Sequence, residues 1–236
     1  MTFDKKTAEF KELFRKEIDN FRKAVNEAED KCIRYEYATE GIGHEEGYYS
    51  PSWVFDHVIG GTKRGRLLKQ KKPNKYAYKY GFDENGKILF SHQYSEGGYC
   101  RVDTYRLYKY AGNITYSIKG DLSDRWTGVH FRNFTEAIYD SERRIIQYAL
   151  YSALNLEIDN LQCQLYHYQD DKIVVTLRRQ FVEYLKRYKR YREYLYDDVY
   201  EFHLDENGNM LYYTSSDGRR FELNPKAINP FQQNYQ

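Results

Sequence analysis

Two small groups of residues have types and spacings that suit chemistry at a site. His44 is followed directly by Glu45 and Glu46, which suits acid–base catalysis, in a glycine-rich stretch expected to form a loop. Cys163 and His167 have the spacing with which two ligands share a metal ion on a helix. On a strand, however, these two side chains stand about 13 Å apart, and adjacent residues do not by themselves converge on one atom. We therefore expect no catalysis, no metal site and no cofactor, since nucleotide-binding and hydrolase motifs are also missing.

The leading candidate for binding is a basic and aromatic stretch, YLKRYKRYREYLY, from Tyr184 to Tyr196. Cations beside aromatic rings neutralise phosphates and stack on bases, and the same side chains serve as anchors in protein interfaces. A second basic stretch runs from Gly60 to Lys75 and is expected to be an exposed connection. The candidate binding residues are Lys186, Arg187, Lys189, Arg190, Arg192, Lys71 and Lys72. A solvated helix face is the structural alternative, because the net charge is only +2.

Composition is that of a soluble globular protein, with 41% hydrophobic and 31% charged residues over 236 positions. Tyrosine is unusually frequent, at 27 residues, which suits strands that either pack or bind a partner with one face. Charge is unevenly distributed, since residues 63–119 carry 13 Lys and Arg against 4 Asp and Glu, whereas residues 1–47 carry 9 against 12. The basic middle can therefore contact an acidic partner or the acidic part of its own chain.

The N-terminal residues lack the apolar core of a signal peptide, and no segment approaches the length of a membrane span. The three cysteines, Cys32, Cys100 and Cys163, are odd in number and scattered, which is typical of reduced, mostly buried residues. We expect a cytoplasmic protein with no membrane partner, unless it is exported by another route.

Hairpin signals organise the chain, because FDENGKILF, which begins at Phe82, is echoed by LDENGNMLY, which begins at Leu204. Asn-Gly between alternating apolar residues is a strong hairpin signal, since both residues tolerate positive φ. The later copy is followed by Asp217-Gly218, which suits a two-residue turn. Together these signals predict a three-stranded meander over residues 199–223.

Loop length sets the register of the first hairpin. With Gly86 in the left-handed position of a three-residue loop, Tyr80 pairs with Phe90 and one face becomes almost wholly aromatic. A two-residue loop would place Tyr80 opposite Ser91 and mix the faces, so we prefer the longer loop. The later copy is expected to keep the same register.

Two stretches have helical periodicity. Residues 5–37 contain no Gly or Pro and repeat apolar residues at alternating spacings of four and three, which predicts one long amphipathic helix. Its heptad spacing also suits a coiled-coil dimer, but packing on its own sheet fits the mixed apolar stripe better. Residues 181–196 place Phe181, Leu185, Tyr188 and Leu195 on one face, which predicts a second helix.

The other segments carry local turn or strand signals. Further elements are expected at 52–59 (a strand), 99–119 (a hairpin turning at Ala111-Gly112-Asn113) and 161–178 (a hairpin turning at Gln169-Asp170-Asp171). Residues 133–154 fit either a helix capped by Asn133 and Glu136 or two strands joined at DSERR, which aligns loosely with DENGK. We favour the strands.

These patterns predict an α+β fold in one domain, 1–236, with an antiparallel, hairpin-built β-sheet. We expect it to carry a long N-terminal amphipathic helix and a second helix near 181–196. The expected parts are a helix over 1–38, a first hairpin half over 48–120, a second half over 133–223 and a tail over 224–236.

The hairpin phrases resemble two families of bacterial repeats. FDENGKIL and LDENGNML are similar to the tyrosine-rich YD repeat of large secreted polymorphic toxins, and Tyr139-Asp140 adds to that likeness. They also resemble the cell-wall and glucan-binding hairpin repeat of bacterial surface proteins, which implies binding of choline or glucan between stacked hairpins. The chain departs from the second family because its copies stand 122 residues apart and it has two tryptophans, Trp53 and Trp126.

As a whole, the chain resembles the immunity proteins of bacterial polymorphic toxin systems, being a small, tyrosine- and charge-rich α+β protein with hairpin-built strands. That resemblance implies a non-catalytic protein that binds and neutralises a cognate toxin in the producer's cytoplasm, and it carries over no functional residue. Our leading hypothesis is therefore a protein-binding module with a protein partner, most concretely a toxin domain. The alternatives are an RNA- or DNA-binding protein using residues 63–75 and 186–192, and a cell-wall or carbohydrate-binding repeat protein.

Overall fold

The computed structural model of this chain forms two compact units. The described residues are 3–39, 47–61, 65–69, 77–94, 102–123, 128–154, 156–185 and 190–223. Unit 1 consists of Met1–Ala111, Thr115–Thr135 and Ser152–Ile158, and unit 2 consists of Gly112–Ile114, Glu136–Tyr151 and Asp159–Gln236. The expected tail over 224–236 lies outside the described residues.

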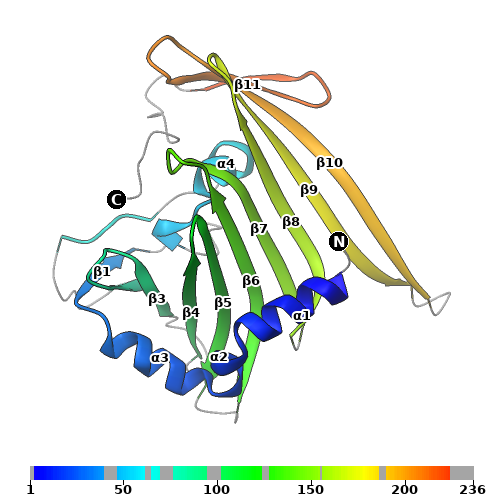
Figure 1. Ribbon diagram of the computed structural model, residues 1–236. Helices are drawn as coiled ribbons and strands as arrows, with labels where there is room; N and C mark the ends of the chain where they lie inside the picture. The colour runs from blue at the N-terminus through cyan, green and yellow to red at the C-terminus, as the bar shows by residue number, and fades with distance from the viewer. Residues whose placement is uncertain are drawn as a thin grey trace. The chain divides into compact units, whose positions relative to one another are not determined.

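Antiparallel strands dominate the fold, as predicted, and twelve of them follow one another in chain order, each hydrogen-bonded to the next (Figure 1). The helical segments are α1 (Phe3–Leu13), α2 (Arg15–Asp19), α3 (Phe21–Asp30), the 3-10 helix η1 (Gly47–Tyr49) and α4 (Trp53–Gly60). The strands are β1 (Arg34–Ala38), β2 (Tyr78–Phe82), β3 (Ile88–Tyr94), β4 (Val102–Ala111), β5 (Ile114–Ser123), β6 (Val129–Tyr139), β7 (Ile145–Leu154), β8 (Glu157–Tyr168), β9 (Lys172–Leu185), β10 (Arg190–Leu204), β11 (Met210–Ser215) and β12 (Arg220–Glu222).

In unit 1 the N-terminal helices lie across one face of the strands (Figure 1). Phe10 of α1 stacks on Phe134 of β6 with ring centroids 4.7 Å apart, and Phe21 of α3 meets Phe131 edge-on at 5.3 Å. Phe14, between α1 and α2, is fully buried beside Phe134. Burying a phenyl side chain contributes about 1.5–3 kcal/mol relative to exposure, so these rings form the core that joins the helices to the sheet.

The predicted continuous helix over 5–37 is wrong in its length and continuity. Phe14 (φ −107°, ψ 18°) and Asn20 (φ −148°, ψ 73°) leave helical geometry and divide the segment into three helices. The Asn20 side chain then caps α3 by accepting a hydrogen bond from the Lys23 N–H. The last helix ends at Asp30, and residues 34–38 form β1 instead. The prediction of an N-terminal helical segment packed on its own sheet is confirmed.

The β2–β3 hairpin confirms the predicted three-residue loop. Gly86 has a φ of 76° and donates its N–H to the Asp83 carbonyl oxygen at 3.1 Å. The predicted pairing of Tyr80 with Phe90 is wrong, because a bulge shifts the register between Gly81 and Phe82 and leaves Tyr80 opposite Ser91. A bulge of this kind inserts one extra residue without changing the loop, so loop length alone does not set the register further along the strands.

The same loop recurs in unit 2. In the β10–β11 hairpin Gly208 has a φ of 76°, and the predicted register again shifts by one residue, between His203 and Leu204. Between β6 and β7, Arg143 takes the glycine position with a φ of 62°, and the prediction of two strands over 133–154 is confirmed. The predicted two-residue turn at Asp217-Gly218 is wrong, since the Ser215 N–H donates to the Arg219 carbonyl oxygen across a three-residue loop. The predicted meander of β10, β11 and β12 is confirmed.

Unit 2 contains the long β9–β10 ribbon, and the predicted helix over 181–196 is wrong. Strand β9 continues to Leu185, β10 begins at Arg190, and the pairing runs without a break to His203 opposite Lys172. The apolar residues spaced as on a helix belong to two strands, so that Phe181 lies opposite Tyr194. Cross-strand pairing of aromatic residues outweighs a local helical preference, because each pair adds packing that an isolated helix face lacks.

The remaining predictions concern one short strand and two hairpins. The predicted strand over 52–59 is wrong, because α4 forms there and ends at Gly60, and the next residue, Gly61, provides a left-handed cap with a φ of 63°. The predicted hairpins turning at 111–113 and 169–171 are confirmed as β4–β5 and β8–β9.

Candidate functional site

Five of the seven predicted binding residues lie outside the part of the chain that the structure describes. Lys186, Arg187, Lys189, Lys71 and Lys72 lie outside the described residues, and so do His44, Glu45 and Glu46. Arg190 and Arg192 lie at the start of β10, where the structure describes the backbone but not the side chains. Residues 190–196 therefore belong to strand β10 and not to the predicted basic helix.

Cys163 and His167 lie on β8, so their predicted placement on a strand is confirmed. Cys163 is buried opposite Arg178, and burial raises the pKa of its thiol to about 11. The thiol is therefore protonated near neutral pH and is a poor nucleophile and metal ligand. Within the described residues, no group of three His, Cys, Asp or Glu side chains is placed to hold a metal ion.

In unit 1 two lysines of the basic middle of the chain pair with glutamates of the acidic N-terminal part. The Lys109 ammonium donates to the Glu17 carboxylate at 2.8 Å, and Lys79 pairs with Glu29. Both pairs join a lysine from residues 63–119 to a glutamate from residues 1–47. The uneven charge of the sequence thus serves contacts within the chain.

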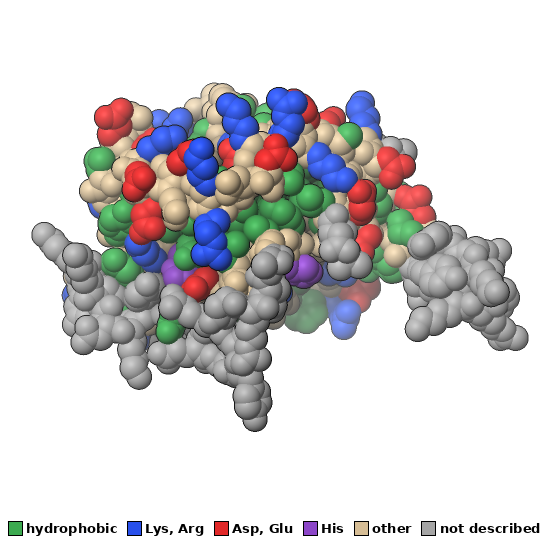
Figure 2. Space-filling view, turned by 90° about the horizontal axis from the view of Figure 1, so that it is seen from below, with side chains coloured by type: hydrophobic (Ala, Val, Ile, Leu, Met, Phe, Trp, Pro, Cys, Tyr) green, Lys and Arg blue, Asp and Glu red, His purple; other side chains and the backbone are tan. Residues whose placement is uncertain are grey.

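Arg106 of β4 shows how far unit 1 encloses its polar groups. Its guanidinium is 2% exposed and donates to Ser117 Oγ at 2.7 Å and to Asn133 Oδ1 at 3.0 Å. Asp121 is also 2% exposed and accepts from Thr104 at 2.7 Å. Buried polar groups of this kind must be satisfied, and here they bind one another. Figure 2 shows lysine, arginine, aspartate and glutamate interspersed over the side of the molecule that it presents.

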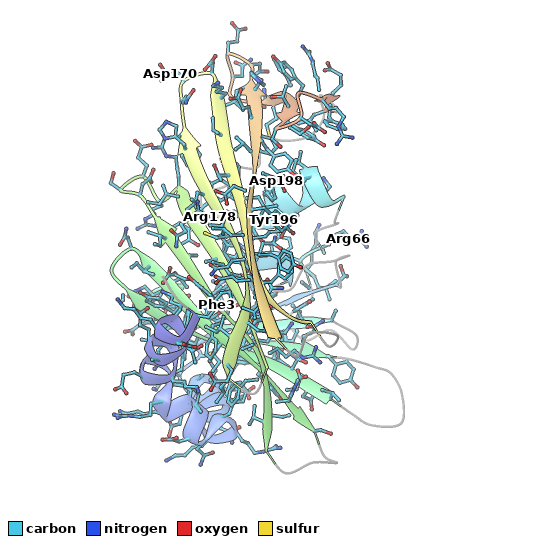
Figure 3. All side chains as sticks on the ribbon, turned by 90° about the vertical axis from the view of Figure 1, so that its right-hand side faces the viewer. Phe3, Arg66, Asp170, Arg178, Tyr196 and Asp198 are labelled. Carbon is cyan, nitrogen blue, oxygen red and sulfur yellow. The ribbon has the colours of Figure 1, made fainter. Side chains whose placement is uncertain are left out.

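The β9–β10 ribbon of unit 2 has two unlike faces. We use the name open ribbon for residues 178–182 of β9 with residues 193–199 of β10. Residues directly opposite each other share a face, so the first face carries Arg178 and Asp197, whereas the second carries Phe181 and Tyr194. Figure 3 shows Arg178 on one side of the ribbon and Tyr196 and Asp198 on the other.

The first face of the open ribbon carries cross-strand polar pairs. Arg178 donates two hydrogen bonds to Asp197, at 2.9 and 2.7 Å, and Gln180 donates to Glu193. The hydrogen bond from Arg178 lowers the pKa of the Asp197 carboxyl. Leu195, which is 63% exposed, lies between Glu193 and Asp197 on this face, and Val199, which is 36% exposed, follows Asp197.

The second face of the open ribbon is aromatic. Phe181 stacks on Tyr194 with ring centroids 4.9 Å apart and meets Tyr196 edge-on at 6.2 Å. Arg179 lies over the Tyr196 ring at 5.8 Å and pairs with Asp198 at 3.6 Å. The Tyr196 side chain is nevertheless 43% exposed, so the cluster presents an aromatic surface. Aromatic and arginine side chains held in this way are typical anchors of protein interfaces.

Exposed apolar residues concentrate in this part of the chain. Seven large hydrophobic side chains are exposed among the described residues, and five of these belong to β10, β11 and β12, namely Leu195, Tyr196, Val199, Leu211 and Phe221. Scattered exposed hydrophobics need no explanation, but a group on adjacent strands marks an interaction site. The open ribbon is therefore the candidate functional site.

Sequence reasoning did not name Leu195 and Tyr196 as binding residues, because it placed them in a helix, and it placed Val199 only at the start of the meander over 199–223. A signal for a strand was present, since Tyr194, Tyr196, Tyr200 and Phe202 follow the period of two that a strand requires. That alternation was masked by the basic residues upstream, which continue the helical spacing.

Comparison with protein-family models, with curated proteins and with solved structures finds no match for this chain. No helix among the described residues is long and apolar enough to cross a membrane.

Proposed function

We propose that this chain is a protein-binding module that recognises its partner with the open ribbon, and most concretely an immunity protein that neutralises a cognate bacterial toxin. The supporting observation is the exposure of Leu195, Tyr196 and Val199 on two faces of one strand, beside an aromatic cluster held by Arg179. Burying such residues in an interface releases water from apolar surface and orders few flexible side chains, because the rings are already packed.

The pairing of cations in unit 2 favours a protein over a nucleic acid as the partner. The lysines and arginines with described side chains between Lys172 and Glu222 each lie within 4.0 Å of a carboxylate; they are Lys172, Arg178, Arg179, Arg219 and Arg220. A nucleic-acid surface instead needs cations in excess to neutralise phosphates.

The first test is affinity capture from a lysate of the native host, with nuclease treatment and with high salt in parallel. We expect a stoichiometric protein that survives both treatments, and we expect co-expression of this chain to restore growth of bacteria that produce the captured protein. Nucleic acid that is lost at moderate salt, or a captured protein whose production leaves growth unaffected, would contradict the toxin-neutralising function.

A pair of variants connects the function to the surface. Leu195→Glu places a charge at the 63% exposed position of the open ribbon, and Ile33→Glu does the same at a 71% exposed position of unit 1. We expect Leu195→Glu to abolish capture and growth rescue and Ile33→Glu to retain both, with thermal midpoints close to that of the unmodified chain. Equal capture by the two variants would move the site away from the open ribbon.

A further inference from the structure

Half of strand β10 has a backbone edge that no described strand covers. Strand β9 pairs with β10 from Arg190 to His203, but β11 pairs only with Tyr200–Leu204 on the opposite side. Residues 190–199 therefore present one side of their backbone with no partner among the described strands, and in Figure 1 this part of β10 is the margin of the ribbon. We call this side of residues 190–199 the free edge.

The hydrogen bonding of the ribbon shows which groups point to the free edge. The Leu204 N–H donates to the Asp171 carbonyl oxygen, and the β9–β10 ladder continues from there without a register shift. Because bonding directions alternate along a strand, even-numbered residues of β10 bond to β9. The N–H and C=O groups of the odd-numbered residues therefore point outward; these are Tyr191, Glu193, Leu195, Asp197 and Val199.

The other ends of the sheet are protected. In unit 1 the outer side of β1 is covered by residues 66–68, since Thr39 donates to Arg66 and Leu68 donates to Tyr37 through their backbones. In unit 2 the last strand, β12, is only three residues long. Proteins usually cover or shorten an edge in these ways because an exposed one templates pairing with another chain. The free edge is longer than β12 and carries exposed apolar side chains.

We infer that the partner adds an extended segment to the free edge as an antiparallel strand, which rests on the protein-binding function proposed above. Main-chain hydrogen bonds would supply affinity, and side chains alternating over Leu195 and Tyr196 would supply specificity. The edge accepts about nine residues, or roughly 30 Å of extended chain, before Ser215 takes the place opposite Tyr200.

Charge defines the chemistry of that segment. Asp197 and Asp198 are already neutralised by Arg178 and Arg179, whereas Arg190 and Arg192 add positive charge at the start of β10. An antiparallel strand runs its C-terminal end past the start of β10. The complementary segment is therefore apolar at its N-terminal end and acidic at its C-terminal end.

A second copy of β10 fits this edge poorly in the two-fold register centred on Leu195. Two-fold pairing centred on Leu195 would place Arg190 of the copy opposite Tyr200, where Ser215 already lies. It would also set Glu193 opposite Asp197, and like charges directly opposite each other are destabilising.

The test uses a fluorescent nine-residue peptide of alternating valine and threonine that ends in two glutamates. Fluorescence anisotropy should show saturable binding to the full chain. It should weaken by about tenfold when the glutamates are replaced by lysines. A peptide N-methylated at every residue should not bind, because it lacks on both of its edges the N–H groups that an added strand must donate.

The matched protein variants are Leu195→Pro and Leu195→Thr. Proline removes an N–H that points away from β9, so the ribbon is kept and the free edge is blocked, whereas threonine keeps the N–H and shortens the apolar side chain. We expect Leu195→Pro to weaken peptide binding by at least about tenfold and Leu195→Thr by less than about threefold. Circular dichroism verifies that the variants fold. If Leu195→Pro fails to fold, the N-methylated peptide still tests, on the unmodified chain, whether binding depends on main-chain hydrogen bonds at the free edge.

Three results would overturn strand addition. They are absence of peptide binding, equal binding of the N-methylated peptide, and a light-scattering mass that is dimeric for the unmodified chain but monomeric for Leu195→Pro, which would assign the edge to a second copy. If one of these results is obtained while affinity capture and growth rescue persist, the proposed protein-binding function still holds, but the binding mode is not strand addition.

Discussion

The two units share an antiparallel architecture but differ in whether their apolar side chains are buried. In unit 1 a sheet face is covered by helices, and its aromatic residues Phe10, Phe14 and Phe134 are at most 1% exposed. In the open ribbon of unit 2, Tyr196 and Leu195 are 43% and 63% exposed although they lie on a longer strand. The comparison indicates that apolar side chains stabilise the fold in unit 1 and are available for recognition in the open ribbon.

The polar groups differ in the same way. Arg106 in unit 1 is enclosed and donates to two buried side chains, so its hydrogen bonds are part of the core. The Arg178–Asp197 pair in unit 2 has side chains that are 44% and 37% exposed. Exposed pairs contribute little to stability because water screens them, but they hold the surface in one arrangement.

The largest expected effect comes from emptying the core of unit 1. Phe134→Ala removes a ring whose centroid lies 4.7 Å from that of Phe10 and 6.2 Å from that of Phe14. We therefore expect a loss of about 3–5 kcal/mol in the free energy of unfolding. Tyr196→Ala in the open ribbon should cost less than about 1 kcal/mol. Urea unfolding followed by circular dichroism measures both, and comparable losses would break the distinction between the units.

Next in size is the removal of the buried guanidinium. Arg106→Met removes the hydrogen bonds that the guanidinium donates to Ser117 and Asn133 in a buried site, and we expect a loss of about 2–3 kcal/mol in the free energy of unfolding. Arg178→Met is the matched change at an exposed pair and should cost less than about 1 kcal/mol. The same unfolding assay compares them, and an Arg106→Met variant as stable as the unmodified chain would contradict the role of the network.

A smaller effect, of opposite sign, is expected in the β6–β7 loop. Arg143 adopts a φ of 62° in the position that Gly86 fills in the β2–β3 loop of unit 1. Left-handed geometry costs a non-glycine residue about 1–2 kcal/mol, part of which the greater freedom of glycine in the unfolded chain offsets. Arg143→Gly should therefore raise the free energy of unfolding by up to about 1 kcal/mol, and Gly86→Ala should lower it by a similar amount. A destabilised Arg143→Gly variant would show that the arginine makes contacts that outweigh the backbone strain.

The smallest effect is a pH dependence at the ribbon. The hydrogen bond from Arg178 lowers the pKa of Asp197 in the folded state, so its contribution is present above the unfolded pKa, about 3.9, and disappears as pH falls through the folded value. We expect Asp197→Asn to reduce stability by less than about 1 kcal/mol at pH 7 and to make no difference near pH 2. Thermal unfolding at both pH values measures this, and a difference that persists in acid would point to packing rather than charge.

Local chemistry was predictable from the sequence, whereas long-range pairing was not. Asp83 and Gly86 specify a three-residue loop through contacts within five residues, and the loop is confirmed. The bulge between Gly81 and Phe82 depends on how whole strands pair, and no residue type predicts it. The same reason explains the free edge of the candidate site, because that edge results from where β11 begins to pair with β10.

The wrongly predicted helix over 181–196 shows most clearly that long-range strand pairing could not be predicted from the sequence. Its apolar residues lie at helical spacing, yet the chain reverses between Leu185 and Arg190, and the ladder pairs Phe181 with Tyr194. A helix would place these residues on one face, whereas the hairpin pairs them across two strands, and a neighbouring strand that pairs with β9 favours the hairpin. Strand β8 supplies that neighbour by pairing along β9 up to Phe181.

The most direct test of the account is amide hydrogen exchange on β10, resolved residue by residue by NMR in the free protein. If one edge of this strand is open, the amides of Glu193, Leu195 and Asp197 exchange at least about tenfold faster than those of Tyr194, Tyr196 and Asp198, which are bonded to β9. Addition of the acidic nine-residue peptide should then slow the first set alone. Equal protection of both sets in the free protein would show that the edge is already covered and would contradict the central claim.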